Sequence, residues 1–157
     1  MIAGCQNESE SVSGLRVSLI PDHTSYQIGQ PISVALVLEN TSSTPLLLQT
    51  RMAVNVRQLC PSASCDVHFV IADPLGRELE YRWLARVRLI EQTDFVNISP
   101  GEQYQVQLDL AQYYAPFDEA GKYTANVVYE NQNDPGDGRL AWKGRLASNN
   151  VAFTLEP

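Results

Sequence analysis

Apolar and polar side chains alternate along most of the chain from Leu15 onward. In the clearest run, 103–110, Tyr104, Val106, Leu108 and Leu110 are separated by Gln and Asp residues. A period of two residues predicts a β-strand with one face on the core and one face in water. The same period predicts strands over Leu15–Leu19, Ile32–Leu38, Leu46–Leu48, Met52–Val56, Val67–Ile71, Tyr123–Tyr129 and Val151–Leu155.

Two stretches are less simple. In 78–91 the apolar residues occupy every odd position from Leu79 to Leu89, which favours one long strand, although part of this run also fits helical spacing. The stretch Leu110–Glu119 is helix-like but contains Pro116, so we expect a turn or a brief 3₁₀ segment. Asp73-Pro74-Leu75-Gly76 has the composition of a tight turn.

Seven to nine short strands with frequent turns and no long helix predict an all-β fold, an antiparallel β-sandwich. The 157 residues match the usual size of one domain. We therefore expect a single domain over 15–157, preceded by a separate segment over 1–14.

The formal charge of −7 argues against nucleic-acid binding, which needs a clustered basic face. It also argues against electrostatic docking on anionic lipid. No catalytic or cofactor motif is present: the two histidines lie in unlike contexts, His23 in a turn and His68 at a polar strand position that should face water. We expect neither enzymatic activity nor a bound cofactor or metal.

Three cysteines leave one unpaired whenever two form a disulfide. Cys60 and Cys65 enclose Pro-Ser-Ala-Ser between two predicted strands, and a disulfide here implies an oxidising compartment. Two free thiols are the alternative. A metal site would need two further ligands that the sequence does not place nearby.

Cys5 stands in an informative context. Ile2-Ala3-Gly4-Cys5 resembles the bacterial lipobox, in which the cysteine is lipidated and becomes the mature N-terminus. The polar run after it is similar to the flexible tether of a lipoprotein. A free cysteine in a polar tail is the alternative. The resemblance implies that 1–14 are a lipobox remnant and tether, that Cys5 anchors the protein to a membrane, and that Gln6, in place of Asp, directs it to the outer membrane facing the periplasm.

Three further segments resemble bacterial immunoglobulin-like domains. Tyr26–Ser42 is similar to the Y-x-x-G-x-x-[IV] opening found in such domains, including the bacterial intracellular proteinase inhibitor family. Gly121–Ala125 resembles the G-x-Y-x-[AV] penultimate strand, in which the Tyr hydroxyl returns to the backbone of the preceding bend. Trp142–Phe153 is similar to the ending of related envelope proteins. The resemblance implies an immunoglobulin-like, Greek-key sandwich.

Two groups of polar residues are candidate sites. The acidic, Gly-rich stretch 131–138 contains Asn131, Asn133, Asp134 and Asp137, and it reads as a solvated loop, a calcium site or a partner contact. Arg82, Arg86 and Arg88 would share one strand face, where they would either be solvated or bind a carboxylate or phosphate.

Together these features predict a lipid-anchored envelope protein with a non-catalytic immunoglobulin-like module that binds a protein or glycan. The alternative is a proteinase inhibitor acting through an exposed loop, as the resemblance of Tyr26–Ser42 suggests.

Overall fold

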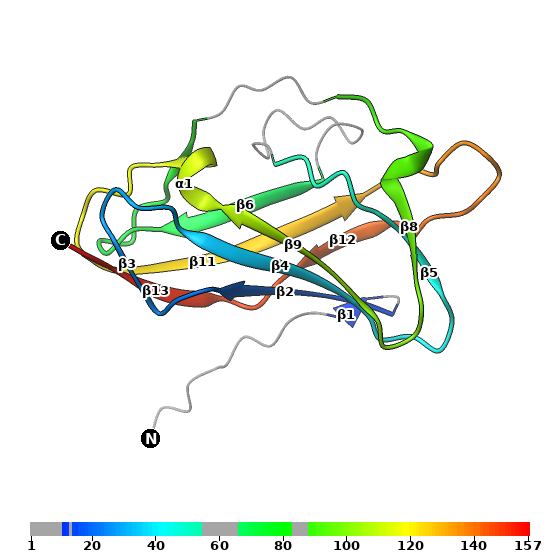
Figure 1. Cartoon of the computed structure of the whole chain (residues 1–157), viewed down its shortest axis with the longest axis horizontal. Coiled ribbons are helices and arrows are strands. Elements are labelled where there is room, and N and C mark those ends of the chain that lie inside the picture. The colour runs from blue at the N-terminus through cyan, green and yellow to red at the C-terminus, as the bar shows by residue number, and fades with distance from the viewer. Residues whose placement is uncertain (1–10, 13, 55–65, 83–87) are drawn as a thin grey trace.

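The computed structural model describes residues 11–12, 14–54, 66–82 and 88–157, and the regular secondary structure of this part of the chain is almost entirely β (Figure 1). Its helices are α1 (Leu110–Tyr113) and the 3₁₀ turn η2 (Gln92–Asp94). The strands are β1 (Ser11–Val12), β2 (Leu15–Pro21), β3 (Ser25–Gln27), β4 (Ser33–Asn40), β5 (Leu46–Gln49), β6 (Val67–Ala72), β7 (Glu80–Tyr81), β8 (Phe95–Ile98), β9 (Gln103–Asp109), β10 (Tyr114–Ala115), β11 (Gly121–Asn131), β12 (Gly144–Ala147) and β13 (Val151–Glu156). The all-β prediction is confirmed.

Two sheets account for most of these strands. The first has the order β1-β2-β4-β9, and all its pairs are antiparallel. The second is built around the long strand β11, which pairs with β6 on one edge and with β12 and β13 on the other. Strand β3 joins the second sheet in parallel to β13. Two small two-stranded sheets, β5–β8 and β7–β10, lie beside them.

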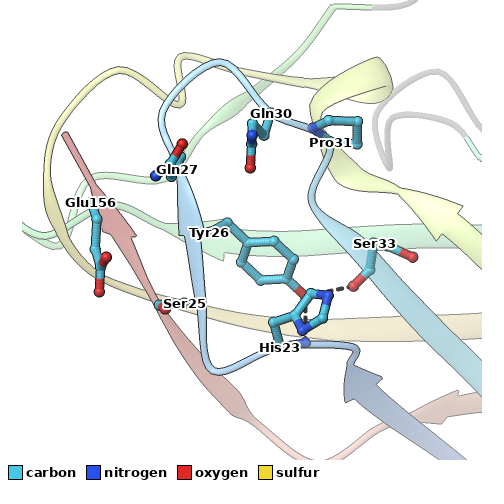
Figure 2. A pocket seen from close by; sticks show the side chains of 8 residues that line it. All are labelled: His23, Ser25, Tyr26, Gln27, Gln30, Pro31, Ser33 and Glu156. Carbon is cyan, nitrogen blue, oxygen red and sulfur yellow. Dashed lines mark hydrogen bonds between the residues drawn. The ribbon is translucent and has the colours of Figure 1, made fainter.

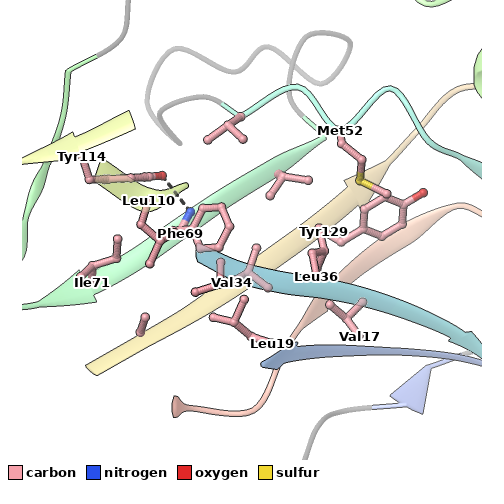
Figure 3. Close-up of a cluster of buried hydrophobic side chains, with 14 of the residues drawn as sticks. Val17, Leu19, Val34, Leu36, Met52, Phe69, Ile71, Leu110, Tyr114 and Tyr129 are labelled. Carbon is pink, nitrogen blue, oxygen red and sulfur yellow. Dashed lines mark hydrogen bonds between the residues drawn. The ribbon is translucent and has the colours of Figure 1, made fainter. Parts of the chain in front are cut away.

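The core lies between the two main sheets (Figure 3). Leu19 of β2 and Leu36 of β4 are buried from the first sheet, and Ile71 of β6 and Tyr129 of β11 from the second. Full burial of each such side chain contributes about 1.5–3 kcal/mol to stability. The alternation predicted for β2 is visible directly, because its odd positions from 15 to 19 are buried and its even positions are partly exposed.

Side chains close the outer edges of two strands. At β2, the Leu19 N–H donates to Asn149 Oδ1 over 3.0 Å, and Asn149 Nδ2 donates back to the Leu19 carbonyl over 3.2 Å. At β6, the Phe69 N–H donates to the hydroxyl of Tyr114 over 2.8 Å. These bonds satisfy backbone N–H and carbonyl groups that have no neighbouring strand to pair with at these positions.

The predicted long strand over 79–89 is wrong within the described residues. Strand β7 ends at Tyr81, and Leu89, expected on the core face, is 85% exposed. The pairing stops after Arg82, whose N–H donates to the Tyr113 carbonyl, because in this antiparallel register the next partners would be the residues of the helical turn α1. Residues 83–87 lie outside the described part.

Two further sequence predictions need correction. In Met52–Val56 the structure shows only an isolated parallel bridge between Val54 and Val67, while 55 and 56 lie outside the described residues. His68 was expected to face water but is only 7% exposed. It stands opposite Val128 of β11, which is also buried, so this part of the outer face is covered. The expected 3₁₀ turn after β9 is the single α-turn α1.

Tyr123 of the Gly121–Ala125 motif, on β11, makes the hydrogen bond that the resemblance implies. Tyr123 is fully buried, and its hydroxyl donates to the carbonyl of Glu119 over 3.0 Å, at the bend just before β11. Its ring stacks on Phe153 of β13 with centroids 5.7 Å apart. Burial raises the pKa of the Tyr123 hydroxyl, which keeps it a donor. One side chain therefore connects the bend to the core.

We expect Tyr123→Phe to lower the free energy of unfolding by about 1 kcal/mol, because it removes this hydrogen bond and leaves the Glu119 carbonyl without it. Tyr104→Phe is the matched control, since in the described structure no hydrogen bond involves the hydroxyl of half-buried Tyr104. Urea unfolding of both variants measures the difference. Equal stability losses would contradict this role of Tyr123.

Candidate functional site

An open hollow of about 500 Å³ lies at the end of the molecule where β3 and the start of β4 meet the C-terminal strand (Figure 2). The ring of Tyr26 lies at its centre in this view. Around the ring are His23, Ser25, Gln27, Gln30, Ser33 and Glu156.

Tyr26 holds the hollow in shape. Its hydroxyl donates to the Ser33 carbonyl over 2.6 Å and accepts the backbone N–H of His23 over 3.2 Å. Its ring packs edge-on against Phe153 at 5.6 Å, and the ring of His23 packs edge-on against Tyr26 at 5.7 Å. Burial raises the pKa of the Tyr26 hydroxyl, so it remains protonated and able to donate.

The rim of the hollow is a tight turn between β3 and β4. The Gln30 N–H donates to the Gln27 carbonyl over 3.1 Å, and Gly29 has a φ of +86°, a conformation that favours glycine. Within the same turn, the Ile28 N–H donates to the Glu156 carbonyl over 2.9 Å. The motif Tyr26-Gln27-Ile28-Gly29 thus builds a wall of the hollow as well as a bend.

A second open hollow of about 420 Å³ shares Pro31 and Ser33 with the first. Its other walls come from the end of β9 and from α1: Gln107, Leu108, Asp109, Gln112 and Tyr113. Asp109 fixes this corner, because its Oδ1 accepts the N–H groups of Ile32 (2.9 Å) and Ala111 (3.0 Å). We call the two together the β3–β4 hollows.

The β3–β4 hollows offer amides, hydroxyls, two carboxylates and one imidazole, and their walls include no Lys or Arg. Such a lining suits a neutral ligand that is rich in hydrogen-bonding groups better than a phosphate or carboxylate. In the described structure no hydrogen bond links the His23 ring to Ser25 or Ser33, so the nucleophile–base contact of a hydrolase is not formed there.

The predicted loop 131–138 lies at the other end of the molecule and is held by its own polar groups (Figure 1). Asn131 is buried and donates through Nδ2 to the carbonyls of Asn133 and Trp142. Asp134 accepts the Ala141 N–H and pairs with Lys143, while Asp137 pairs with Arg139. Within the described residues no group of three or more His, Cys, Asp or Glu is arranged to hold a metal.

The predicted arginine row is not assembled on a strand in the described residues. Arg82 is exposed just after β7, where its N–H donates to the Tyr113 carbonyl over 2.8 Å. The guanidinium of Arg88 is bound to the carboxylate of Asp94, through Nη1 at 2.7 Å and also through Nη2. Arg86, Cys5, Cys60 and Cys65 lie outside the described residues, so their predicted roles stay predictions.

Arg51 and Asp66 form a buried ion pair that the sequence does not predict. Arg51 and Asp66 have side chains only 5% and 3% exposed and form a bidentate pair, with Nε–Oδ2 at 2.8 Å and Nη2–Oδ1 at 2.9 Å. Asp66 also accepts the Ala53 N–H, and Arg51 Nη1 donates to the Arg88 carbonyl over 2.6 Å. Geometry of this quality offsets part of the cost of burying two charges. A spacing of 15 residues in sequence gives no signal for it.

The neighbouring pair makes stability depend on pH. Hydrogen bonding to Arg88 holds the pKa of Asp94 below its ordinary value, and the Glu91 N–H adds to this effect. A depressed folded-state pKa gives stability that is present above the unfolded pKa of about 3.9 and is lost as the pH falls through the folded value. We expect Asp94→Asn to flatten the acid loss of stability, as measured by urea unfolding from about pH 5 downward.

Arg88→Gln should flatten the same profile, because it removes the partner that lowers the pKa. Arg145→Gln is the matched control, since Arg145 of β12 is exposed and makes no ion pair among the described residues. A profile for Asp94→Asn that coincides with that of the unchanged chain would contradict the assignment.

No protein family model matches the chain, and no curated protein matches it in sequence. Among the described residues, no helix has both the length and the apolar character needed to cross a membrane.

Proposed function

We propose that this chain is a lipid-anchored protein of the bacterial cell envelope whose immunoglobulin-like domain binds a partner through the β3–β4 hollows. The observation that carries the proposal is their position relative to the proposed tether. The end of the proposed tether is β1, which pairs with β2, and it joins the domain at Gly14, whose carbonyl accepts the Thr41 N–H over 2.7 Å, just after β4 ends. The hollows lie where β4 begins, at Ser33, and β4 spans roughly 24 Å. Anchoring through Cys5 would therefore present the hollows away from the membrane.

The strand order supports an immunoglobulin-like, Greek-key sandwich. The chain runs from β2 in the first sheet to β3 beside the last strand, and returns to β4 in the first sheet. It then alternates through β6, β9 and β11, and ends in β12 and β13. A sheet that contains β2, β4 and β9, facing a sheet that contains β6, β11 and β13, supports the proposed fold. Loops at the ends of such sandwiches commonly bind partners.

The junction between tether and domain is close-packed. Gly14 has a φ of +78°, and a Cβ at this position would lie 2.5 Å from Ser42 Cβ. Gly14 thus permits the close turn that lays β1 antiparallel to β2. Figure 1 shows β1 and the loop 131–138 toward the same end of the molecule, away from β3, which favours the β3 end as the partner-facing surface.

The ligand chemistry follows from the lining. Side-chain amides and hydroxyls bind sugar hydroxyls or peptide main chain, and the net charge of −7 disfavours acidic ligands. We therefore propose a neutral glycan or an extended peptide segment as the partner, with no catalytic step. The cysteines Cys60 and Cys65 would form a disulfide in this compartment.

The anchor is tested by metabolic labelling with radioactive palmitate, with the protein expressed from its own reading frame in a bacterial host. We expect label in the unchanged protein and none in Cys5→Ala, because lipidation needs that thiol. Cys60→Ala is the matched control and should keep the label. Equal labelling of the unchanged protein and Cys5→Ala would refute the anchor.

The binding surface is tested on glycan and peptide arrays. We expect the unchanged chain to bind a member of one array, and Gln30→Lys to weaken that binding roughly tenfold or more, because a cation at the rim replaces an amide. Gln132→Lys adds the same charge at the opposite end and should leave binding unchanged. Binding that both variants retain would locate the surface elsewhere. Inhibition of a serine protease by the chain would favour the proteinase inhibitor alternative instead.

A further inference from the structure

Among the described residues, strand β9 is paired along one edge, with β4, and its other edge is open. The Asn40 N–H donates to the Glu102 carbonyl over 3.0 Å, and the Leu110 N–H donates to the Ile32 carbonyl over 3.0 Å. With this register, even-numbered residues of β9 exchange backbone hydrogen bonds with β4. The N–H and carbonyl groups of Gln103, Gln105 and Gln107 therefore point away from the sheet. The described residues give these outward groups no hydrogen-bond partner.

This open edge differs from the other long edges. Asn149 closes the outer edge of β2, and Tyr114 closes that of β6. Natural proteins guard open edges with Lys, Pro, a bulge or a very short strand. Strand β9 has none of these: its seven residues are Gln-Tyr-Gln-Val-Gln-Leu-Asp, and its register with β4 is regular throughout. A long, regular and unguarded edge is a template for another strand.

We propose that two copies of this chain associate through their β9 edges, as an antiparallel pair with its two-fold axis at Gln105. The pairing is self-complementary: Gln105 opposes its own copy, and Gln103 opposes Gln107. Three outward-facing residues on each strand would form about six backbone hydrogen bonds and join the two sheets into one.

The charge distribution favours a second copy as the occupant. Two chains with a formal charge of −7 repel each other over most of their surfaces, but 103–108 has no ionisable carboxylate or ammonium group. In the proposed register Asp109 would oppose Gly101, and Glu102 would oppose Leu108. No two carboxylates therefore directly oppose each other across the pair.

The test uses the whole 157-residue chain in reducing buffer, so that no intermolecular disulfide contributes, with sedimentation equilibrium over a range of concentrations. We expect a monomer–dimer equilibrium. Gln105→Lys and Gln105→Glu should each raise the dissociation constant roughly fivefold or more, because like charges then meet at the axis. An equimolar mixture of the two variants should recover dimer, because unlike charges then meet there.

This pair of variants separates the proposal from a general charge effect. Lys lowers the net negative charge and Glu raises it, so general repulsion would move the two dissociation constants in opposite directions. Gln92→Lys, on an exposed residue of η2, is the charge-matched control and should not weaken the dimer.

A backbone test completes the experiment. Gln105→Pro removes the outward N–H without removing a bond to β4, so it should fold and lose the dimer. Circular dichroism and urea unfolding establish that each variant folds. A chain that stays monomeric at every concentration would overturn the proposal. So would a dimer that withstands all three Gln105 variants, or an edge that pairs with peptides from the array but not with itself.

Discussion

The burial of β4 against β11 is the interaction on which the rest of the structure depends. Val34, Leu36 and Leu38 of β4 are inaccessible to solvent, as are Val127 and Tyr129 of β11. Each of these two strands is paired on both edges, β4 with β2 and β9, and β11 with β6 and with β12 and β13. Their backbone groups are thus satisfied inside the sheets while their side chains supply the centre of the core. Strands β2 and β9 are placed by pairing with β4, and β6, β12 and β13 by pairing with β11.

Once two twisted sheets are stacked, their edges and ends become the places where backbone groups can remain unpaired. This chain closes several of them with single side chains: Asn149 beside β2, Tyr114 beside β6 and Tyr123 at the bend before β11. Asn40 serves the same purpose at the end of β4, where its Nδ2 donates to the carbonyls of Thr44 and Ile98. These four polar side chains therefore satisfy backbone groups at the edges and ends of strands. Among the described residues, the outer edge of β9 has no such side chain.

A single side chain that bonds to the backbone also shapes the candidate site. Tyr26 connects the start of β4 to the turn before β3, and in doing so it leaves a polar hollow between that turn and the C-terminal strand. The tether would join at the opposite end of β4, so one strand separates the proposed anchor from the proposed binding surface. A sandwich held by its core can vary such end loops at little cost in stability, which is why binding surfaces commonly occur there.

The sequence by itself determined the strands whose alternation is strong, because one buried face imposes a period of two. Tyr104–Leu108, Tyr123–Tyr129 and the odd positions of β2 are of this kind. The motif resemblance also located the hydrogen bond of Tyr123 to its preceding bend. The prediction was wrong over 79–89, because alternation states which face is apolar but not whether a partner strand of equal length exists. The helical turn α1 directly precedes β10, so no extended partner continues beyond Tyr81.

Only the tertiary structure decided the features that join distant segments. The β3–β4 hollows need the parallel pairing of β3 with β13, and the ion pair of Arg51 with Asp66 needs two loops brought together. The burial of His68 depends on what lies over its sheet, not on its own strand. Local sequence carries the period of a strand because that period follows from its own backbone. The strand with which it pairs, the register of that pairing and the residues that pack over its outer face depend on contacts between residues far apart in the chain. These contacts form only when the sheets stack.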